Sequence, residues 1–378
     1  MKLKNVHIKN INKKILLGTF TLVMSTVPLI GCANQSIVNI DQVVVSQQNT
    51  ISISSITYSQ FKSGIENGLI ASSIDDKAMK HNTKYLQQLI DKASTNEIIK
   101  LPLGEFYFYP QKSDFTNENY IIKFSEKTKN ITIEGAGNDK NFYNRTVLKP
   151  YGVTTSGIHM FYFNSYRESK FKSPIYLEGI TFKNFTIDGI NATGKIYNSE
   201  GKGFMINLYK NCHWSYVTVK NTWGTGFGMD CPINSSIDNC VAVNCGLGAY
   251  LYNPVDNAPG ASGFGIGTGY SDNESIKITN CIAIENGKFG FFFENQSRFN
   301  TGFYKETKGN FEVRNSLSIG NLYNYGGLKA HDVVYRNNIG IITDNTILNV
   351  YFDDESERYK VDEFTTEIES NKILTYKK

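Results

Sequence analysis

Two short hydrophobic patterns alternate along the second half of the chain. One has an aliphatic residue on each side of a variable residue and is followed by polar residues, as in VTVKN, VAVNC, IAIEN and LSIGN. The other begins with Gly-Phe or a similar pair, as in GFMIN, GFGMD, GFGIG, GFFFE and YGGLK. Both patterns alternate with the period of two residues that is typical of β-strands. In three of the four pairs, the second pattern ends 10 or 11 residues after the second aliphatic residue of the first.

This repeated pair of strands predicts a solenoid rather than a globular sheet. One repeat takes about 24 residues, as between Val219 and Val243. Gly, Asn and Thr fill the gaps between the strands, which leaves no room for the helices of a βαβ arrangement. We therefore predict an all-β fold, a single-stranded parallel β-helix. Because a solenoid grows by adding coils, a chain of 378 residues is consistent with one folded domain.

Residues 1–31 have the layout of a secretory signal. Five lysines precede an apolar run from Ile15 to Ile30, and the run ends in LIGC at Cys32. This ending resembles the lipobox of bacterial lipoproteins, in which the cysteine is lipidated and becomes the mature N-terminus. We expect a lipid on Cys32 to anchor the protein to the membrane at the bacterial cell surface. The alternative is an ordinary signal peptide or membrane anchor with an incidental cysteine.

Removal of this segment changes the charge balance of the chain. The 39 basic and 35 acidic residues become 34 basic and 35 acidic residues, so the mature chain gives no support for nucleic-acid binding. Five cysteines remain after Cys32, an odd number without C-x-x-C spacing, which argues against a disulfide framework or a zinc site. Cys240 and Cys281 occupy the same position of successive coils and are expected to be reduced.

The remaining chain divides into three parts. Residues 32–74, rich in Ser, Gln, Asn and Val, are interpreted as a tether and lead-in segment. Asp75 to Ala93 has a helical pattern and is followed by EIIKLPLGEFYFYP. This stretch resembles the start of right-handed parallel β-helix proteins of the pectate-lyase-like superfamily, in which a capping helix covers the first coil. The β-helix domain is expected to span 75–350, and the charged residues 351–378 to form a C-terminal cap or tail.

Alternation assigns two faces to the Gly-Phe strand. One inward column contains Phe204, Phe227, Phe264 and Phe291, and the other contains Ile206, Met229, Ile266, Phe293 and Leu328. One outward column contains Met205, Gly228, Gly265, Phe292 and Gly327, and the other contains Asn207, Asp230, Gly267, Glu294 and Lys329. With coils about 4.8 Å apart, Asp230 and Glu294 should lie about 10 Å apart, with Lys329 one coil beyond Glu294.

Two insertions, at 250–262 and 295–310, would leave the solenoid at opposite edges of this outward face and form the walls of a groove. Side chains that could stack on sugars or bond to them are available there. They are Tyr250, Tyr252, Tyr270, Arg298, Phe303 and Tyr304. Asn207 and Phe292 on the outward face, and His331 beside Asp332, complete the candidate substrate-binding residues. In the alternative interpretation this is a solvated face with a weak Glu294–Lys329 ion pair.

Residues 226–295 resemble the polygalacturonase branch of the β-helix enzymes. GMDC at 228–231 is similar to the G-D-D-C segment of that family, and SGFGIGTG at 262–269 to its G-H-G-L-S-I-G-S segment. FGMD at 227–230 also resembles the Y-G-F-D-P-H segment of mannuronan C5-epimerases. Both resemblances imply a polysaccharide substrate and single out Asp230 as a catalytic residue.

Three functional classes remain open. In a hydrolase, Asp230 and Glu294 would be the acid and the base. In a lyase or epimerase acting on an acidic glycan, Lys329 or a tyrosine would take the C5 proton, while Asp230, Asn207 or a cation such as Ca²⁺ neutralises the sugar carboxylate. The third class is a glycan-binding or adhesin-type lipoprotein without catalysis. We predict an extracellular polysaccharide-active enzyme, with no metal-ligand set assigned and no other cofactor expected.

Overall fold

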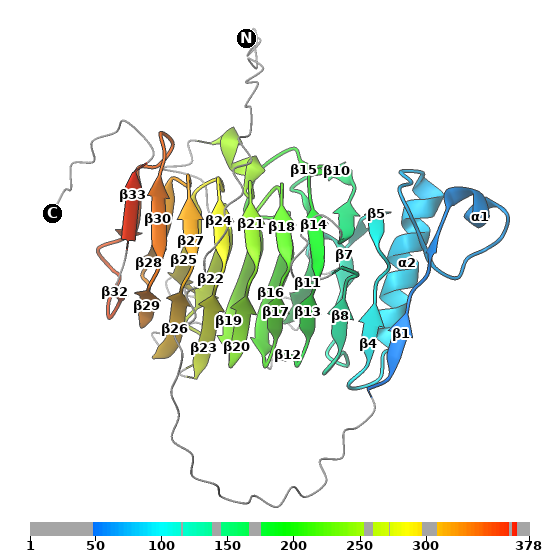
Figure 1. Cartoon of the computed structure of the whole chain (residues 1–378), viewed down its shortest axis with the longest axis horizontal. Coiled ribbons are helices and arrows are strands. Elements are labelled where there is room, and N and C mark those ends of the chain that lie inside the picture. Colours follow the sequence, from blue (N-terminus) through cyan, green and yellow to red (C-terminus); the bar gives the residue numbers. More distant parts are fainter. Residues whose placement is uncertain are drawn as a thin grey trace, which may run out of the picture. The chain divides into compact units, whose positions relative to one another are not determined.

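The structure, a computed structural model, describes residues 48–114, 116–137, 145–165, 175–252, 260–271, 273–296, 308–362 and 365–368. Cys32 and the segment before it lie outside the described residues. The strands form three long sheets, and successive strands of the chain pass from one sheet to the next (Figure 1). This arrangement confirms the predicted fold, a right-handed parallel β-helix.

The three sheets are named by the order in which each coil visits them. The first sheet contains β1 (Thr50–Ser52), β4 (Ile98–Lys100), β8 (Thr132–Glu134), β13 (Thr181–Lys183), β17 (His213–Ser215), β20 (Ser235–Asp238), β23 (Glu274–Thr279), β26 (Gly309–Arg314), β29 (Val333–Arg336) and β32 (Lys360–Asp362). The second contains β5 (Gly104–Phe108), β9 (Thr146–Pro150), β14 (Phe185–Asp188), β18 (Thr218–Lys220), β21 (Val241–Val243), β24 (Ile282–Ile284), β27 (Leu317–Ile319), β30 (Ile339–Ile342) and β33 (Thr365–Ile368). The third contains β6 (Gln111–Lys112), β7 (Asn119–Lys123), β11 (Ile158–Asn164), β12 (Leu177–Glu178), β16 (Phe204–Lys210), β19 (Phe227–Ile233), β22 (Phe264–Thr268), β25 (Phe289–Asn295), β28 (Tyr323–Leu328) and β31 (Leu348–Phe352).

Smaller elements lie outside these sheets. They are the strand pairs β2 (Ser55–Ile56) with β3 (Leu69–Ile70) and β10 (Gly152–Thr154) with β15 (Ala192–Gly194), and the helices α1 (Tyr58–Lys62), α2 (Asp76–Lys92) and η1 (Leu247–Leu251). Within the described ranges, no helix combines the length and the apolar character that crossing a membrane requires.

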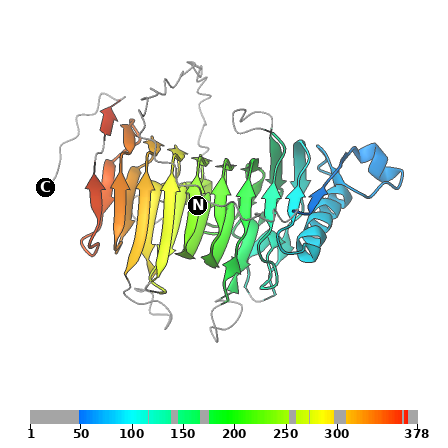
Figure 2. The ribbon, with the colours of Figure 1, turned by 60° about the horizontal axis from the view of Figure 1, so that its bottom comes forward.

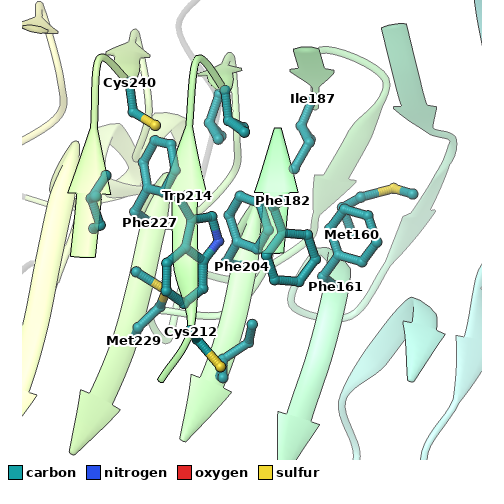
Figure 3. Packing of buried hydrophobic residues seen from close by; sticks show 14 of the residues in the cluster. Met160, Phe161, Phe182, Ile187, Phe204, Cys212, Trp214, Phe227, Met229 and Cys240 are labelled. Atoms are coloured by element: carbon teal, nitrogen blue, oxygen red, sulfur yellow. The ribbon is translucent and has the colours of Figure 1, made fainter. Parts of the chain in front are cut away.

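A column of stacked rings forms the centre of the core. The ring centroids of Phe227 and Phe264 are 4.7 Å apart and those of Phe264 and Phe291 are 4.8 Å apart, with nearly parallel planes. Phe204 extends the same column toward the N-terminus, where Trp214 packs edge-on against it (Figure 3). The predicted inward column of phenylalanines is therefore confirmed.

The predicted register of the last repeat is wrong by one residue. Tyr325, not Gly326, continues the phenylalanine column, with its ring 5.2 Å from that of Phe291. Its hydroxyl donates to the carbonyls of Ser316 and Ile339, so the polar end of the ring is satisfied inside the core. Stacking of this ring, rather than alignment of the glycines, sets the register of β28.

Asparagines in the left-handed region form the corners between the first and second sheets. Their φ angles lie between 51° and 61° in five coils, and asparagine tolerates this region better than most residues. They are Asn184, Asn239, Asn280, Asn315 and Asn337. These corners of one or two residues are short enough to keep the successive coils in register.

All five cysteines after Cys32 are buried, and none of them forms a disulfide within the described residues. Cys240 and Cys281 lie in adjacent coils, with the two thiols in contact, and the Cys281 thiol also donates to the carbonyl of Thr279 (3.1 Å). Burial raises the pKa of Cys281 well above its usual range, which keeps it a neutral thiol. The cysteines therefore act as small core residues.

Helix α2 covers the open end of the first coils, as Figure 2 shows. The Asp75 side chain caps its N-terminus. From the buried face, Asn82 accepts from the Ile70 N–H (2.7 Å) and donates to the carbonyls of Ile70 (2.9 Å) and Tyr107 (3.0 Å). Thr83 bonds in the same two-way manner to the backbone of Tyr109. The predicted capping helix is present, and its polar side chains satisfy strand groups that would otherwise lack partners.

The ladder continues beyond the boundary expected at residue 350. That boundary falls inside β31, and the two following strands, β32 and β33, join the first and second sheets. The charged residues after 350 thus contribute strands to the solenoid.

Replacement of Asn82 should detach this cap. We expect Asn82→Ala to lower the free energy of unfolding by about 3 kcal/mol, because it leaves buried N–H and C=O groups without partners. Gln88→Ala, at an exposed position of the same helix, should change it by less than about 0.5 kcal/mol. Urea unfolding of both variants measures the difference, and equal losses would contradict the capping role.

Candidate functional site

Asp230 lies in β19, on the outward face of the third sheet. Its neighbours in the same column are Asn207 of β16 and Gly267 of β22. The Gly267 N–H donates to Asp230 Oδ1 (3.1 Å), and the Asn207 amide, with its nitrogen facing the carboxylate, donates to Oδ2 (2.8 Å). Asn207 is fully buried, whereas Asp230 is half-buried. The carboxylate is thus fixed from both adjacent coils while it still reaches the surface.

Gly267 provides the space that this carboxylate occupies. A Cβ atom at Gly267 would overlap Oδ1 of Asp230 far inside van der Waals contact. The sequence pattern placed this glycine in an outward column. The structure gives Gly267 a more specific role, because only glycine leaves the space in which Asp230 accepts from the Gly267 N–H group.

Glu294 follows in the same column, one coil beyond Gly267. It is half-buried and accepts a hydrogen bond from Gln296 Nε2 (2.8 Å). Two coil spacings separate the backbones of Asp230 and Glu294, which corresponds to about 10 Å. The structure therefore brings these two carboxylates to one column.

Lys329 does not belong to this column. Because Tyr325 sets the register of β28, Leu328 lies opposite Glu294 and Lys329 comes after the strand. Lys329 has a φ of 48°, and its ammonium group pairs with Glu355. The expected position of a cation one coil beyond Glu294 is wrong.

Lys202 provides a cation that the sequence pattern missed. Its side chain crosses the outward face at Gly228, where a Cβ atom would lie only 2.5 Å from Lys202 Cδ. The ammonium nitrogen is 3.4 Å from the sulfur of Met205, and no carboxylate of the described residues pairs with it. Gly228 precedes Asp230 by two residues, about 7 Å along the strand. Lys202 lies outside both repeated patterns, which explains why alternation gave no signal for it.

A buried carboxylate lies beside the end of the same strands. Glu274, at the start of β23, is 1% exposed and accepts from the backbone N–H groups of Gly269 (2.8 Å), Tyr270 (2.8 Å) and Ser271 (3.0 Å). Burial raises the pKa of Glu274 to about 7; the three N–H groups oppose this shift, and the charge of Asp230 adds to it. No repeated pattern marks Glu274, because it is a single acidic residue at the start of a strand.

Two tyrosines accompany Glu274. Tyr270 is carried by the turn that Glu274 holds, and Tyr176 hydrogen-bonds to the Ser271 side chain of that turn. Burial raises the pKa of Tyr176 to about 12, and the neighbouring Tyr270 contributes. At neutral pH the Tyr176 phenol is therefore protonated and can act as a proton donor.

The other predicted binding residues lie at different ends of β22 or outside the described residues. Tyr250 and Tyr252, which are 63% and 42% exposed, lie on and next to η1, before the start of β22. Tyr270 lies after the end of that strand. Arg298, Phe303 and Tyr304, together with most of both predicted walls, lie outside the described residues.

Phe292 and His331, two further predicted binding residues, are buried. Phe292 is in an outward column, as expected, but it is 5% exposed and stacks on Phe289 with centroids 4.4 Å apart. Tyr323 packs on the other side of Phe289. His331 is 8% exposed in the turn before β29. Packing against neighbouring aromatic rings accounts for the burial of the Phe292 side chain without a bound ligand.

A separate polar cluster is buried near the N-terminal coils. Glu118, His159 and Glu200 place ligand-type atoms within 4.8 Å of one another. The Lys202 N–H donates to His159 Nδ1 (3.1 Å), so the neutral ring carries its proton on Nε2 and donates it to Glu200 Oε2 (2.6 Å). A metal on Nε2 would move the ring proton to Nδ1, where it would face the Lys202 N–H donor, and Ca²⁺ takes six to eight oxygen ligands. The cluster therefore fits neither Ca²⁺ nor Zn²⁺.

No family model matches the chain, and no curated protein matches it either. Several solved structures are similar to it. The A-module of the mannuronan C-5 epimerase AlgE4 from Azotobacter vinelandii is 14% identical, with 78% of this chain and 94% of that chain covered and a TM-score of 0.40. The catalytic domain of Agl-KA is 15% identical (84% and 48% covered, TM-score 0.49), and the pectate lyase Pel9A is 14% identical (76% and 72% covered, TM-score 0.42). Similarity at this level transfers neither a substrate nor a reaction.

A methyl group at Gly267 should displace the Asp230 carboxylate. We expect Gly267→Ala to cost about 1–3 kcal/mol of unfolding free energy through overpacking. The cost should largely disappear in the double variant with Asp230→Ala, because the overlapping oxygen is gone. Gly265→Ala is the matched control, since its Cβ would meet side-chain atoms alone, a methyl of Thr225 at 3.1 Å and Ser262 Cβ at 3.6 Å. Additive effects at 230 and 267 would argue against the contact.

Glu274 should make stability depend on pH. Because its pKa in the folded protein is raised from 4.5 to about 7, the stabilising contribution is complete below pH 4.5 and is lost as pH rises through 7. The loss corresponds to about 3 kcal/mol. Glu274→Gln should lack this fall when urea unfolding is compared at pH 5 and pH 8. Parallel pH curves for the two proteins would show that Glu274 titrates near its usual pKa.

Proposed function

We propose that the protein is an extracellular polysaccharide-active enzyme in which Asp230 is the catalytic carboxylate. The observation that supports this most directly is the position of the Asp230 carboxylate, which Asn207 and Gly267 hold on an outward face. A half-buried carboxylate with a defined orientation can exchange a proton with a bound substrate.

The arrangement of the polar residues suits an extended ligand. The columns of the third sheet run across the coils, so a chain lying along them meets a new residue about every 4.8 Å. Asp230, Gly267 and Glu294 follow one another in this way. A polymer fits this spacing better than a small compact molecule does.

An acidic glycan and a lyase or epimerase reaction fit the charges best. Lys202 has no carboxylate partner in the described part of the chain and can pair with a uronate carboxylate, which stabilises the charge that develops when the C5 proton leaves. Asp230 would accept that proton. In elimination, the C4–O bond breaks, a C4–C5 double bond forms and a tyrosine phenol such as Tyr176 protonates the departing oxygen. In epimerisation, C5 is instead reprotonated from the opposite face.

Hydrolysis is the second candidate, because Glu294 shares the column of Asp230. Backbones about 10 Å apart are compatible with the carboxyl separation of roughly 6.5–9.5 Å found in inverting glycosidases. In that reaction one carboxyl group protonates the leaving oxygen, and the other activates the attacking water.

The cellular location is part of the proposal. The signal-like residues 1–31 and the lipobox-like ending at Cys32 support a lipid-anchored protein at the bacterial cell surface. A substrate outside the cell would be consistent with such an anchor.

Asp230→Asn should abolish activity in a screen of acidic and neutral polysaccharides. Loss of a positioned proton-transfer group is expected to lower the rate by roughly 10²–10⁴-fold. Glu312→Gln, at a half-buried position of the first sheet, is the control and should retain activity. Full activity of Asp230→Asn would remove Asp230 from the mechanism.

The products distinguish the reactions. Ultraviolet absorbance of a new C4–C5 double bond identifies elimination, and inverted C5 configuration without cleavage identifies epimerisation. New reducing ends without that absorbance, lost in Glu294→Gln, identify hydrolysis. If a glycan binds to the protein but none of these products forms from any glycan in the screen, the enzyme proposal is contradicted.

A further inference from the structure

We infer that His159 is a positioning residue that sets the place of Lys202 on the outward face, while Glu200 fixes the protonation of the His159 ring. The inference rests on the proposed function, in which the Lys202 ammonium meets an acidic glycan. It assigns to the Glu118–His159–Glu200 cluster the role of holding the Lys202 ammonium group in place.

The backbone of Lys202 is held on both sides by β11. Its N–H donates to His159 Nδ1 (3.1 Å), and its carbonyl accepts from the Met160 N–H (3.1 Å). The Gly203 carbonyl then accepts from the Phe161 N–H (3.1 Å), and regular pairing starts at Phe204. The imidazole thus takes the place of a strand carbonyl just before β16 begins. Any movement of the ring therefore moves the Lys202 backbone.

The ring itself is fixed from its other nitrogen. His159 is fully buried and Glu200 is 9% exposed, so water competes little for the Nε2–H···Oε2 bond of 2.6 Å. Glu118 has its own partners on the other side, accepting from the hydroxyls of Tyr162 (2.6 Å) and Thr116 (2.8 Å). Each glutamate therefore accepts from at least one hydrogen-bond donor of the protein itself.

Anchoring the Lys202 backbone restricts the position of the ammonium group at the end of its side chain. From its anchored backbone the chain crosses Gly228 and brings Nζ to 3.4 Å from the Met205 sulfur. A flexible lysine gains a defined place in this way, because its starting point and the surface beneath it are both fixed. A displacement of about 1 Å at such a group can cost roughly 100-fold in rate.

Two substitutions of His159 separate its two hydrogen bonds. In His159→Asn, the amide oxygen takes the place of Nδ1 and can still accept from the Lys202 N–H. In His159→Gln, the amide nitrogen takes the place of Nε2 and can still donate to Glu200, but the Lys202 N–H loses its acceptor. If His159 works through Lys202, asparagine should rescue function and glutamine should not.

Binding of defined oligouronates in the Asp230→Asn background tests this without turnover. The probes are galacturonate and mannuronate oligomers, with a neutral cello-oligosaccharide as control, measured by calorimetry at low and high salt. We expect Lys202→Met to weaken binding of the acidic oligomers about tenfold or more and to reduce its salt dependence. His159→Gln should weaken it about five- to tenfold, and His159→Asn by less than about twofold.

The reverse order, with glutamine tolerated and asparagine not, would overturn the inference and assign the role to the Glu200 bond. Equal affinity in Lys202→Met and the parent would overturn it as well.

The tautomer of His159 provides a test that needs no ligand. Imidazole ¹⁵N chemical shifts of the full chain should show a protonated Nε2 and an unprotonated Nδ1, unchanged when Zn²⁺ or Ca²⁺ is added. A protonated Nδ1, or a shift of Nε2 on metal addition, would overturn the inference. If the tautomer is as expected and no oligouronate binds to the parent, the positioning network stands and the acidic-glycan proposal fails.

Discussion

The spacing of about 4.8 Å between neighbouring parallel strands is the constraint on which this structure depends. It brings one aromatic ring per coil into stacking distance, as the separations of 4.7 and 4.8 Å in the phenylalanine column show. Inward and outward residues alternate along the same strands, so the packing of a ring fixes which residue lies beside it on the surface. The core therefore determines the place of Asp230 and Glu294, and no loop is needed to bring them together.

The same constraint explains what the sequence could predict. Where an aromatic residue marks each repeat, its register follows from the pattern, and the column of Asn207, Asp230, Gly267 and Glu294 is placed correctly. In the last repeat, alignment of the glycines and stacking of the aromatic ring predict two different registers. The stacking of Tyr325 sets the one that is observed. The predicted cation at Lys329 was lost with that one-residue shift.

Other features depend on contacts that no local pattern encodes. Lys202 reaches the site through a long side chain from outside the repeat, and its anchor, His159, is 43 residues earlier in the chain. Glu274 became a buried acceptor because a turn directs three N–H groups at one carboxylate. The left-handed asparagines could have been suspected from their recurrence after five of the first-sheet strands, yet only the structure shows their backbone conformation.

The contact between Asp230 and Gly267 should also make these two distant positions change together in evolution. A side chain at 267 and an accepting carboxylate at 230 compete for the same space, 37 residues apart in the chain. As sequences of this type diverge, glycine at 267 should persist only while the aspartate does, and the loss of the aspartate should free 267 to accept larger residues. The two positions would then form a signature that separates members that keep this carboxylate from members that have lost it, even where nothing else in the sequences can be aligned.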